Sequence, residues 1–180
     1  MFERYTEQAR RVIFFARWEA GDMGAEAIES EHLLLGLWRE GSKVCEADDL
    51  GAETIDPEPL QEPEHLLLGH WRAGSGVIDD LIGRSDPWPE LRARIKEHSP
   101  PGKRVATSVD MPLSEEVKRV LAFAAEELER SGGKQVDIGH LLLGLLLEEG
   151  CFASGLLRER GADLETIRKR LEKTQGKTTE

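Results

Sequence analysis

The sequence predicts an all-α protein built from repeats. The word His-Leu-Leu-Leu-Gly occurs three times, beginning at His32, His65 and His140. Words that recur in one chain indicate repeated structural units. The apolar residues around them follow helical rather than strand spacing. Aromatic residues make up 6% of the chain and charged residues 33%, a composition that favours a helical globular protein.

Two segments predict equivalent opening helices. Residues 6–20 and 114–129 each carry apolar residues at i, i+3, i+4 and i+7, the pattern of an amphipathic helix. Thr6 and Ser114 are placed to cap them, and glycine residues follow each segment. Both the helices and the words superpose at an offset of 108 residues, which places His32 on His140.

Each Leu-rich word predicts a buried second helix. The leucines expected on its core face are Leu33, Leu34 and Leu37 in the first half and Leu141, Leu142 and Leu145 in the second, with Leu35 and Leu143 widening that face. We expect these helices to end at Gly41 and Gly150. In the second half a short helix and a closing helix over residues 164–173 follow, with Asp163 as a cap.

The middle copy of the word interrupts this pattern. It lies 33 residues after the first copy, and three prolines (Pro57, Pro59 and Pro63) precede it, so the first copy lacks a closing helix. That helix is expected near residues 89–98 instead. The simplest account is two pseudo-symmetric four-helix repeats with an extra helix pair duplicated in the first. The repeats span residues 1–98 and 113–175, joined by a linker over 99–112 into one compact domain.

Composition and missing motifs exclude several classes of protein. The net charge of −11 and pI near 5.0 argue against nucleic-acid binding, which needs a basic surface. The longest apolar run, residues 138–147, is shorter than the ~20 residues that span a bilayer. Cys45 and Cys151 are too few for a disulfide scaffold. Without a signal peptide, we expect a cytoplasmic location. No phosphate-binding loop or nucleophile–base pair has a recognisable setting, so neither enzyme activity nor a cofactor is expected.

The chain resembles the Clp N-terminal (Clp repeat) domain of ClpC/ClpA-type AAA+ unfoldases, and ClpC in particular. The resemblance rests on three stretches in the same order: residues 1–6, the word preceded by Glu31 and followed by residues 37–41, and residues 111–114. It implies a pseudo-two-fold helical bundle that recruits substrate and adaptor proteins. An ATP-driven Clp ring and its protease, in cis or in trans, would then process them.

The resemblance also implies a ligand site. In that family the acid before the word recognises phosphoarginine, and here that acid is Glu31. Arg4 and Thr6 would hold the phosphate, and Phe2 would line a peptide groove. The chemistry is sound, because a carboxylate can accept two hydrogen bonds from a guanidinium. The alternative is that Glu31 only complements the helix dipole and Thr6 is only a cap.

The other copies carry incomplete equivalents of this site. Glu64 precedes the second word but has no Arg/Thr pair before it, and the second repeat keeps the Ser114 hydroxyl but has Gly139 in place of the acid. We therefore expect one site per chain. The residues leave open whether Glu31 or Glu64 occupies the family's helix position. The three histidines are interpreted as helix-start residues rather than metal ligands, because metal ligands must converge.

The leading interpretation is a non-enzymatic recognition module of a Clp-type unfoldase–protease system, with phosphoarginine as a candidate mark on its substrates. Two alternatives remain at this point. One is a free-standing regulator that docks on a Clp ring in trans. The other is a helical-repeat interaction scaffold unrelated to proteolysis.

Overall fold

The computed structural model describes residues 3–41, 88–106 and 109–175, and within these ranges it has seven helices and no strand. They are α1 (Glu7–Met23), α2 (Ser30–Gly41), α5 (Trp88–His98), α6 (Glu115–Ser131), α7 (Ile138–Leu147), α8 (Phe152–Glu159) and α9 (Leu164–Gln175). The predicted all-α class is confirmed. The expected extra helix pair, Phe2, Glu64, His65 and Cys45 lie outside the described residues.

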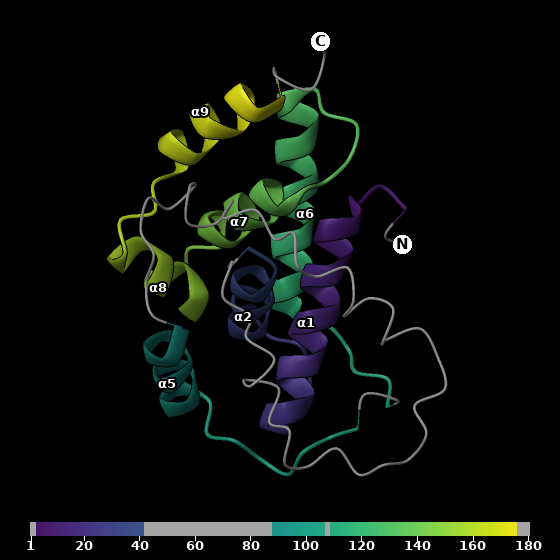
Figure 1. Cartoon of the computed structure of the whole chain (residues 1–180), viewed down its shortest axis with the longest axis vertical. Helices are drawn as coiled ribbons and strands as arrows, with labels where there is room; N and C mark the ends of the chain where they lie inside the picture. The colour runs from purple at the N-terminus through teal and green to yellow at the C-terminus, as the bar shows by residue number, and fades with distance from the viewer. Residues whose placement is uncertain (1–2, 42–87, 107–108, 176–180) are drawn as a thin grey trace.

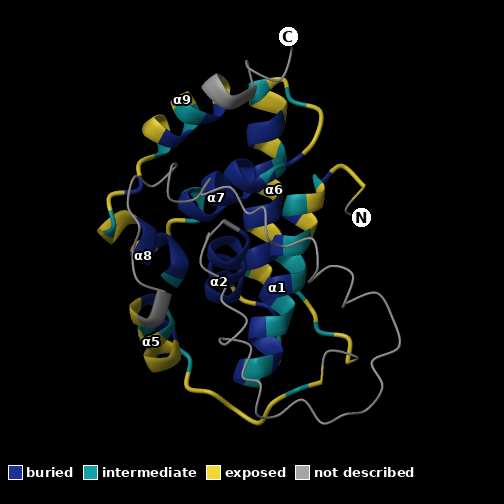
Figure 2. Cartoon of the chain, viewed as in Figure 1, coloured by how far each residue is buried: buried dark blue, intermediate teal, exposed yellow. Residues whose placement is uncertain are grey.

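The helices carrying the Leu-rich words form the centre of the molecule. In Figure 1, α2 and α7 lie between the long helices α1 and α6 on one side and α5, α8 and α9 on the other. Helix α2 contacts both α1 and α5, and α7 contacts both α6 and α9. Figure 2 shows that α2 and α7 are buried almost throughout. Each of these two helices therefore packs against the long helix before it and against a later helix.

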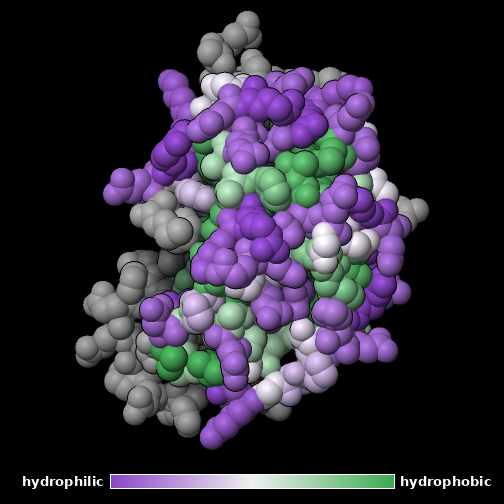
Figure 3. Space-filling view, turned by 180° about the vertical axis from the view of Figure 1, so that it is seen from behind, coloured by the Kyte–Doolittle hydropathy of each residue, from purple (hydrophilic) through white to green (hydrophobic). Residues whose placement is uncertain are grey.

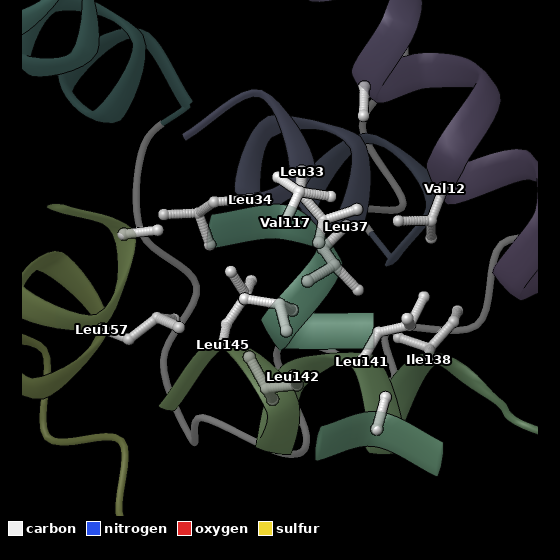
Figure 4. Close-up of a cluster of buried hydrophobic side chains, with 14 of the residues drawn as sticks. Val12, Leu33, Leu34, Leu37, Val117, Ile138, Leu141, Leu142, Leu145 and Leu157 are labelled. Atoms are coloured by element: carbon white, nitrogen blue, oxygen red, sulfur yellow. The ribbon is translucent and has the colours of Figure 1, made fainter. Parts of the chain in front are cut away.

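The core joins the two repeats. The predicted core leucines of α2 and α7 are all at most 2% exposed, and Figure 4 shows Leu33 and Leu37 grouped with Leu141 and Leu145 in one apolar cluster. The leucines expected to widen the faces, Leu35 and Leu143, are buried as well. Burial of this apolar surface is the main force that holds the repeats together.

The glycine of the word allows a close helix crossing. A Cβ atom on Gly36 would lie 2.3 Å from the carbonyl oxygen of Val12, and one on Gly144 would lie 2.3 Å from that of Val120. No real Cβ tolerates such a distance, so glycine is required where α2 crosses α1 and α7 crosses α6. The same crossing thus occurs in both repeats at the offset of 108.

The ends of α1 and α6 are equivalent too. Thr6 and Ser114 accept hydrogen bonds from the backbone N–H groups of Ala9 and Val117, which confirms them as N-caps. At the other end Gly24 and Gly132 adopt left-handed φ angles of 69° and 70°, the conformation in which glycine ends a helix. Both helices run two or three residues further than predicted, because these glycines set their ends.

Helix α7 ends earlier than the predicted Gly150. It stops at Leu147, because side chains from α8 and the residue before it take its last free carbonyl groups. Ser154 Oγ and Arg158 donate to the carbonyl oxygen of Leu146 at 3.3 and 3.1 Å, and the Cys151 thiol donates to that of Leu145. The end of a helix can be satisfied by side chains in this way. Helix α2, in contrast, ends at Gly41 as expected.

Two short backbone bridges cross between the repeats. Tyr5, before α1, pairs in parallel with Val136, before α7, and Leu113, before α6, pairs with Ile28, before α2. The hydrogen bonds match: Thr6 N–H donates to the Val136 carbonyl at 2.9 Å, and Ser114 N–H donates to the Ile28 carbonyl at 2.9 Å. The start of each opening helix therefore lies beside the start of the other repeat's word helix.

The surface of the described residues is mostly hydrophilic. Figure 3 shows apolar groups scattered between polar ones on the face opposite to that of Figure 1. Val109 is the single large hydrophobic side chain in the described ranges that is exposed.

No single helix in the described ranges is long and apolar enough to cross a membrane. Helices α7 and α8 have the required length and hydropathy only when taken together, and a bend of 103° separates them.

Candidate functional site

Glu31 lies where the starts of α2 and α6 meet, a place that we call the α2/α6 junction (residues 28–31 and 113–116). The bridge between Ile28 and Leu113 brings the two helix starts together. The side chain of Glu31 is in the first turn of α2. The residue is 2% exposed. A carboxylate so buried must be hydrogen-bonded or lose its charge.

Two serine hydroxyls hold the Glu31 carboxylate. Ser99, the first residue after α5, donates from Oγ to Glu31 Oε1 at 2.7 Å. Ser30 Oγ lies 3.3 Å from Glu31 Oε2 and 3.2 Å from Glu116 Oε2, so this one hydroxyl bridges two carboxylates. Within the described ranges, no ion pair to Glu31 is present. The junction thus holds a buried acid whose hydrogen-bond donors are neutral.

Glu31 remains ionised despite its burial. Burial alone would raise its pKa, but the hydrogen bonds from Ser99, from its own backbone N–H and from Glu29, together with the nearby His32, outweigh that effect, and its pKa lies below the ordinary value. Burial and the nearby Glu31 charge raise the pKa of Glu29. When the pH falls, Glu29 therefore takes up a proton before Glu31 does. Glu31 supplies a fixed negative charge at neutral pH.

The predicted grouping of Glu31 with Arg4 and Thr6 is not what the structure has. Arg4 and Thr6 belong to a second place, the α1/α7 junction (residues 4–7 and 136–139), where both bond to the backbone of Val136. Glu31 faces the start of α6 instead. The reason is the crossed bridges, which pair each opening helix with the word helix of the other repeat. Of the candidate residues, Ser114 is the one that shares a junction with Glu31.

The α1/α7 junction has no acid, because Gly139 stands at the position equivalent to Glu31. A Cβ atom on Gly139 would lie 2.1 Å from Leu171 Cδ2. The side chain of Leu171, from α9, therefore occupies the space that a larger residue would need. Arg4 is exposed, and Thr6 uses its hydroxyl to cap α1. This junction offers a cation and a helix start, but no partner for a guanidinium.

The repeated histidines have a structural role. His32 Nδ1 accepts from the backbone N–H of Glu29 at 3.0 Å, and His140 Nδ1 accepts from that of Asp137 at 3.1 Å. Both side chains thereby close the first turn of their helix, as in a capping box. No three metal-binding side chains converge anywhere in the part of the chain that the structure describes. The interpretation of His32 and His140 as helix-start residues is confirmed.

Sequence reasoning missed three residues around Glu31: Ser30 and Glu116 within the α2/α6 junction, and Ser99 beside it. Ser30 directly precedes Glu31, and Glu116 lies two residues after the predicted cap Ser114, so their places beside candidate residues could have drawn attention to them. Ser99 has no such signal. It follows the closing helix directly and precedes Pro100 and Pro101, which mark only the end of that helix.

These features define a class of protein: an all-α tandem repeat whose two halves exchange backbone bridges. The profile of the family described as "Clp repeat (R) N-terminal domain" matches residues 58–149 and 113–180. Together these ranges cover more than half of the chain, and the chain belongs to this family. The first range includes the second copy of the word, outside the described residues, whereas the first copy forms α2.

Known relatives agree with this assignment. The chain is 30% identical over 180 residues to "Chaperone protein ClpC2, chloroplastic" of Oryza sativa subsp. japonica, and 28% identical over 175 residues to "Negative regulator of genetic competence ClpC/MecB" of Bacillus subtilis. The matches cover 100% and 95% of this chain but only 16% and 17% of those proteins. The chain is therefore similar to a small part of ClpC-type chaperones.

A solved structure supports the fold. The N-terminal domain of the chaperone ClpD from Arabidopsis thaliana superposes with a TM-score of 0.60 at 23% identity. The superposition covers 96% of this chain and 97% of that domain. The predicted architecture of a Clp N-terminal domain is thus confirmed at the level of fold.

Proposed function

We propose that this chain is a recognition domain that binds substrate or adaptor proteins for a Clp-type unfoldase and its protease. Family membership and the similarity to ClpC-type chaperones support this role. Since the chain corresponds to 16% of the length of such a relative, the ring acts either in the same polypeptide or in trans. We further propose that the domain has no enzyme activity of its own. The cytoplasmic location remains a prediction, since several relatives are named as chloroplastic proteins.

The observation that carries the proposal at residue level is the buried Glu31 carboxylate, held by two serine hydroxyls. Its described donors are the Ser99 and Ser30 hydroxyl groups, the Glu29 carboxyl group and its own N–H, so its charge is not balanced by an ion pair to a described residue. Arginine is the side chain best suited to pair with such a carboxylate, because its planar guanidinium donates two parallel hydrogen bonds. We therefore propose Glu31 as the residue that receives an arginine side chain of the bound protein.

Two ligands contain this guanidinium: phosphoarginine, which the family resemblance implies, and unmodified arginine. The junction favours the second. Glu116 shares the Ser30 hydroxyl with Glu31, and a phosphate placed there would face a second carboxylate. Pro112 stands at the position equivalent to Arg4, so the cation that would balance a phosphate is missing. Ser114 could still donate its hydroxyl to a phosphate, which keeps phosphoarginine as the alternative.

Titration followed by NMR tests this proposal on the full 180-residue chain. The probes are N-acetyl-arginine amide, its phosphoarginine form, and N-acetyl-citrulline amide as the neutral control of equal shape. We expect arginine to shift resonances at the α2/α6 junction and Glu31→Gln to weaken it by about tenfold or more, the loss of one strong charged contact. Binding that survives Glu31→Gln would refute the proposal.

A second substitution separates the two ligands. Glu116→Gln removes the competing carboxylate and keeps the shape of the side chain. If unmodified arginine is the ligand, the wild-type chain binds it more tightly than phosphoarginine, and Glu116→Gln narrows that difference. If phosphoarginine already binds more tightly to the wild type, it is the ligand. Recovery of Clp ring subunits from lysate would distinguish this role from that of a scaffold unrelated to proteolysis.

A further inference from the structure

The contact between Ser99 and Glu31 joins parts of the chain that are 68 residues apart. Its length of 2.7 Å is that of a well-formed hydroxyl–carboxylate hydrogen bond. It covers the one carboxylate oxygen, Oε1, that Ser30 does not contact. Glu31 is consequently closed to solvent in this structure, with 2% of its surface exposed. Oε1 could accept a second hydrogen bond, but because Glu31 is buried and Ser99 only half-buried, a guanidinium gains a place at Oε1 by displacing the Ser99 hydroxyl.

Ser99 is held from both sides. Its backbone N–H donates to the Ile95 carbonyl in the last turn of α5 at 2.8 Å. The segment that follows is fixed to the end of α1, since Gly102 N–H donates to the Met23 carbonyl at 2.7 Å and Val105 N–H to the Gly21 carbonyl at 2.9 Å. The backbone at Ser99 therefore has little freedom. Rotation of the side chain is the movement that the surroundings leave open, because Ser99 itself is only half-buried.

We infer that Ser99 is an internal ligand of the Glu31 site, which a bound arginine side chain displaces. The inference rests on the proposed function of Glu31 and deepens it by naming what regulates access. In the free protein the hydroxyl satisfies Oε1 and keeps the carboxylate ionised. On binding, a charged N–H donor replaces this neutral one, and the hydroxyl turns to solvent. Charged donors form the stronger hydrogen bond to a carboxylate, so the exchange favours the bound arginine. The arginine nevertheless binds less tightly than it would to a site without the competing Ser99 hydroxyl.

The inference predicts that Ser99→Ala binds arginine more tightly than the wild type does. The alanine removes the competing hydroxyl and leaves α5 and the bound segment in place. We expect N-acetyl-arginine amide to bind about tenfold more tightly, as for the loss of one competing hydrogen bond. Ser131→Ala is the matched control, since Ser131 is also a half-buried serine bonded through its hydroxyl, but at the far end of α6. That variant should bind as the wild type does.

The outcomes separate this inference from the proposed function. If the wild type binds arginine through Glu31 and Ser99→Ala binds equally or more weakly, then Ser99 is not a competitor and the inference alone fails. If arginine binds neither the wild type nor Ser99→Ala, both fail. Tighter binding by Ser99→Ala that Glu31→Gln abolishes in the double variant would support both.

Discussion

At the scale of single residues, the recurring word has structural rather than ligand-binding roles. Its histidine closes the first helical turn, its leucines fill the core, and its glycine sets how closely two helices cross. Gly36 and Gly144 show the last point clearly, because each meets a backbone carbonyl that cannot move aside. The glycines of the first and third copies, Gly36 and Gly144, are therefore explained by this crossing rather than by a turn.

Gly36→Ala should therefore destabilise the fold. A methyl group placed 2.3 Å from the Val12 carbonyl oxygen forces α1 and α2 apart, at a cost of about 1–3 kcal/mol or more in the free energy of unfolding. Gly155→Ala is the control, because that glycine lies within α8 with nothing near its Cβ position. Alanine there should stabilise the protein by about 1 kcal/mol, through helix propensity. Urea denaturation measures both, and equal effects would contradict this account.

The candidate site was only partly predictable from the sequence. The position of Glu31 follows from its place before the word, and Gly139 follows from the offset of 108. The partners do not, because a sequence shows neighbours along the chain, whereas the junctions join residues of different repeats. Arg4 and Thr6 were grouped with Glu31 since all three belong to the first repeat. The crossed bridges separate them, and Ser99 comes to Glu31 only through the docking of α5.

At the scale of elements, equivalent ion pairs attach equivalent helices. Arg11 and Glu40 join α1 to α2 at 2.6 Å, and Arg119 and Glu148 join α6 to α7 at 3.0 Å. Glu19 of α1 pairs with Arg92 of α5, and Glu127 of α6 pairs with Arg168 of α9. Arg92 and Arg168 lie 76 positions apart, close to the 75 expected once the duplicated segment is removed. This spacing supports the prediction that α5 is the closing helix of the first repeat.

Glu19 and Glu127 should have opposite effects on stability as the pH changes. Burial raises the pKa of Glu19 above the ordinary 4.5 although Arg39 and Arg92 oppose it. The stability that Glu19 contributes relative to Glu19→Gln is therefore greatest below pH 4.5 and falls as the pH rises through its folded pKa. Burial also acts on Glu127, but hydrogen bonds from Arg168 and Arg130 outweigh it and lower the pKa. Its contribution is present above pH 4.5 and is lost as the pH falls through the folded pKa.

Urea denaturation of the wild type, Glu19→Gln and Glu127→Gln between about pH 3 and pH 7 checks this prediction. The difference in unfolding free energy between wild type and variant should fall with pH for Glu19 and rise with pH for Glu127. Each variant serves as the control for the other, because both change the same position of the repeat. Slopes of the same sign would contradict the assigned environments.

At the scale of the whole molecule, one apolar core spans both repeats, so we expect the chain to unfold in a single step. The tryptophans allow a sharp test, since Trp18, Trp38, Trp71 and Trp88 all precede residue 99. Leu145→Ala, in the second repeat, should lower the unfolding free energy by about 2–5 kcal/mol. It should shift the tryptophan fluorescence and far-UV circular dichroism transitions together. The exposed substitution Lys169→Ala should shift neither, and two separate transitions would mean independent repeats.

The sequence predicted the helical class and the equivalence of the halves well, because period and offset are properties of the chain alone. It did not predict how the halves are joined. The bridges from Tyr5 to Val136 and from Leu113 to Ile28 use backbone groups, which carry no residue signature. The side chains of the bridge residues are hydrophobic, like those of many other positions in the chain, so the sequence alone does not indicate which residues pair.

The crossed bridges have a consequence for how such a domain can arise and change. The two bridges are equivalent at the offset of 108. Tyr5 of the first half pairs with Val136 of the second, and their counterparts Leu113 and Ile28 pair in the same way. That reciprocity is the rule of a two-fold homodimer interface. A polypeptide with one repeat could complete both bridges only by pairing with a second copy of itself. Once a linker joins the copies, the two junctions no longer have to be identical. One junction has the acid Glu31, whereas in the other Leu171 fills the space beside Gly139, a difference that two identical subunits could never show.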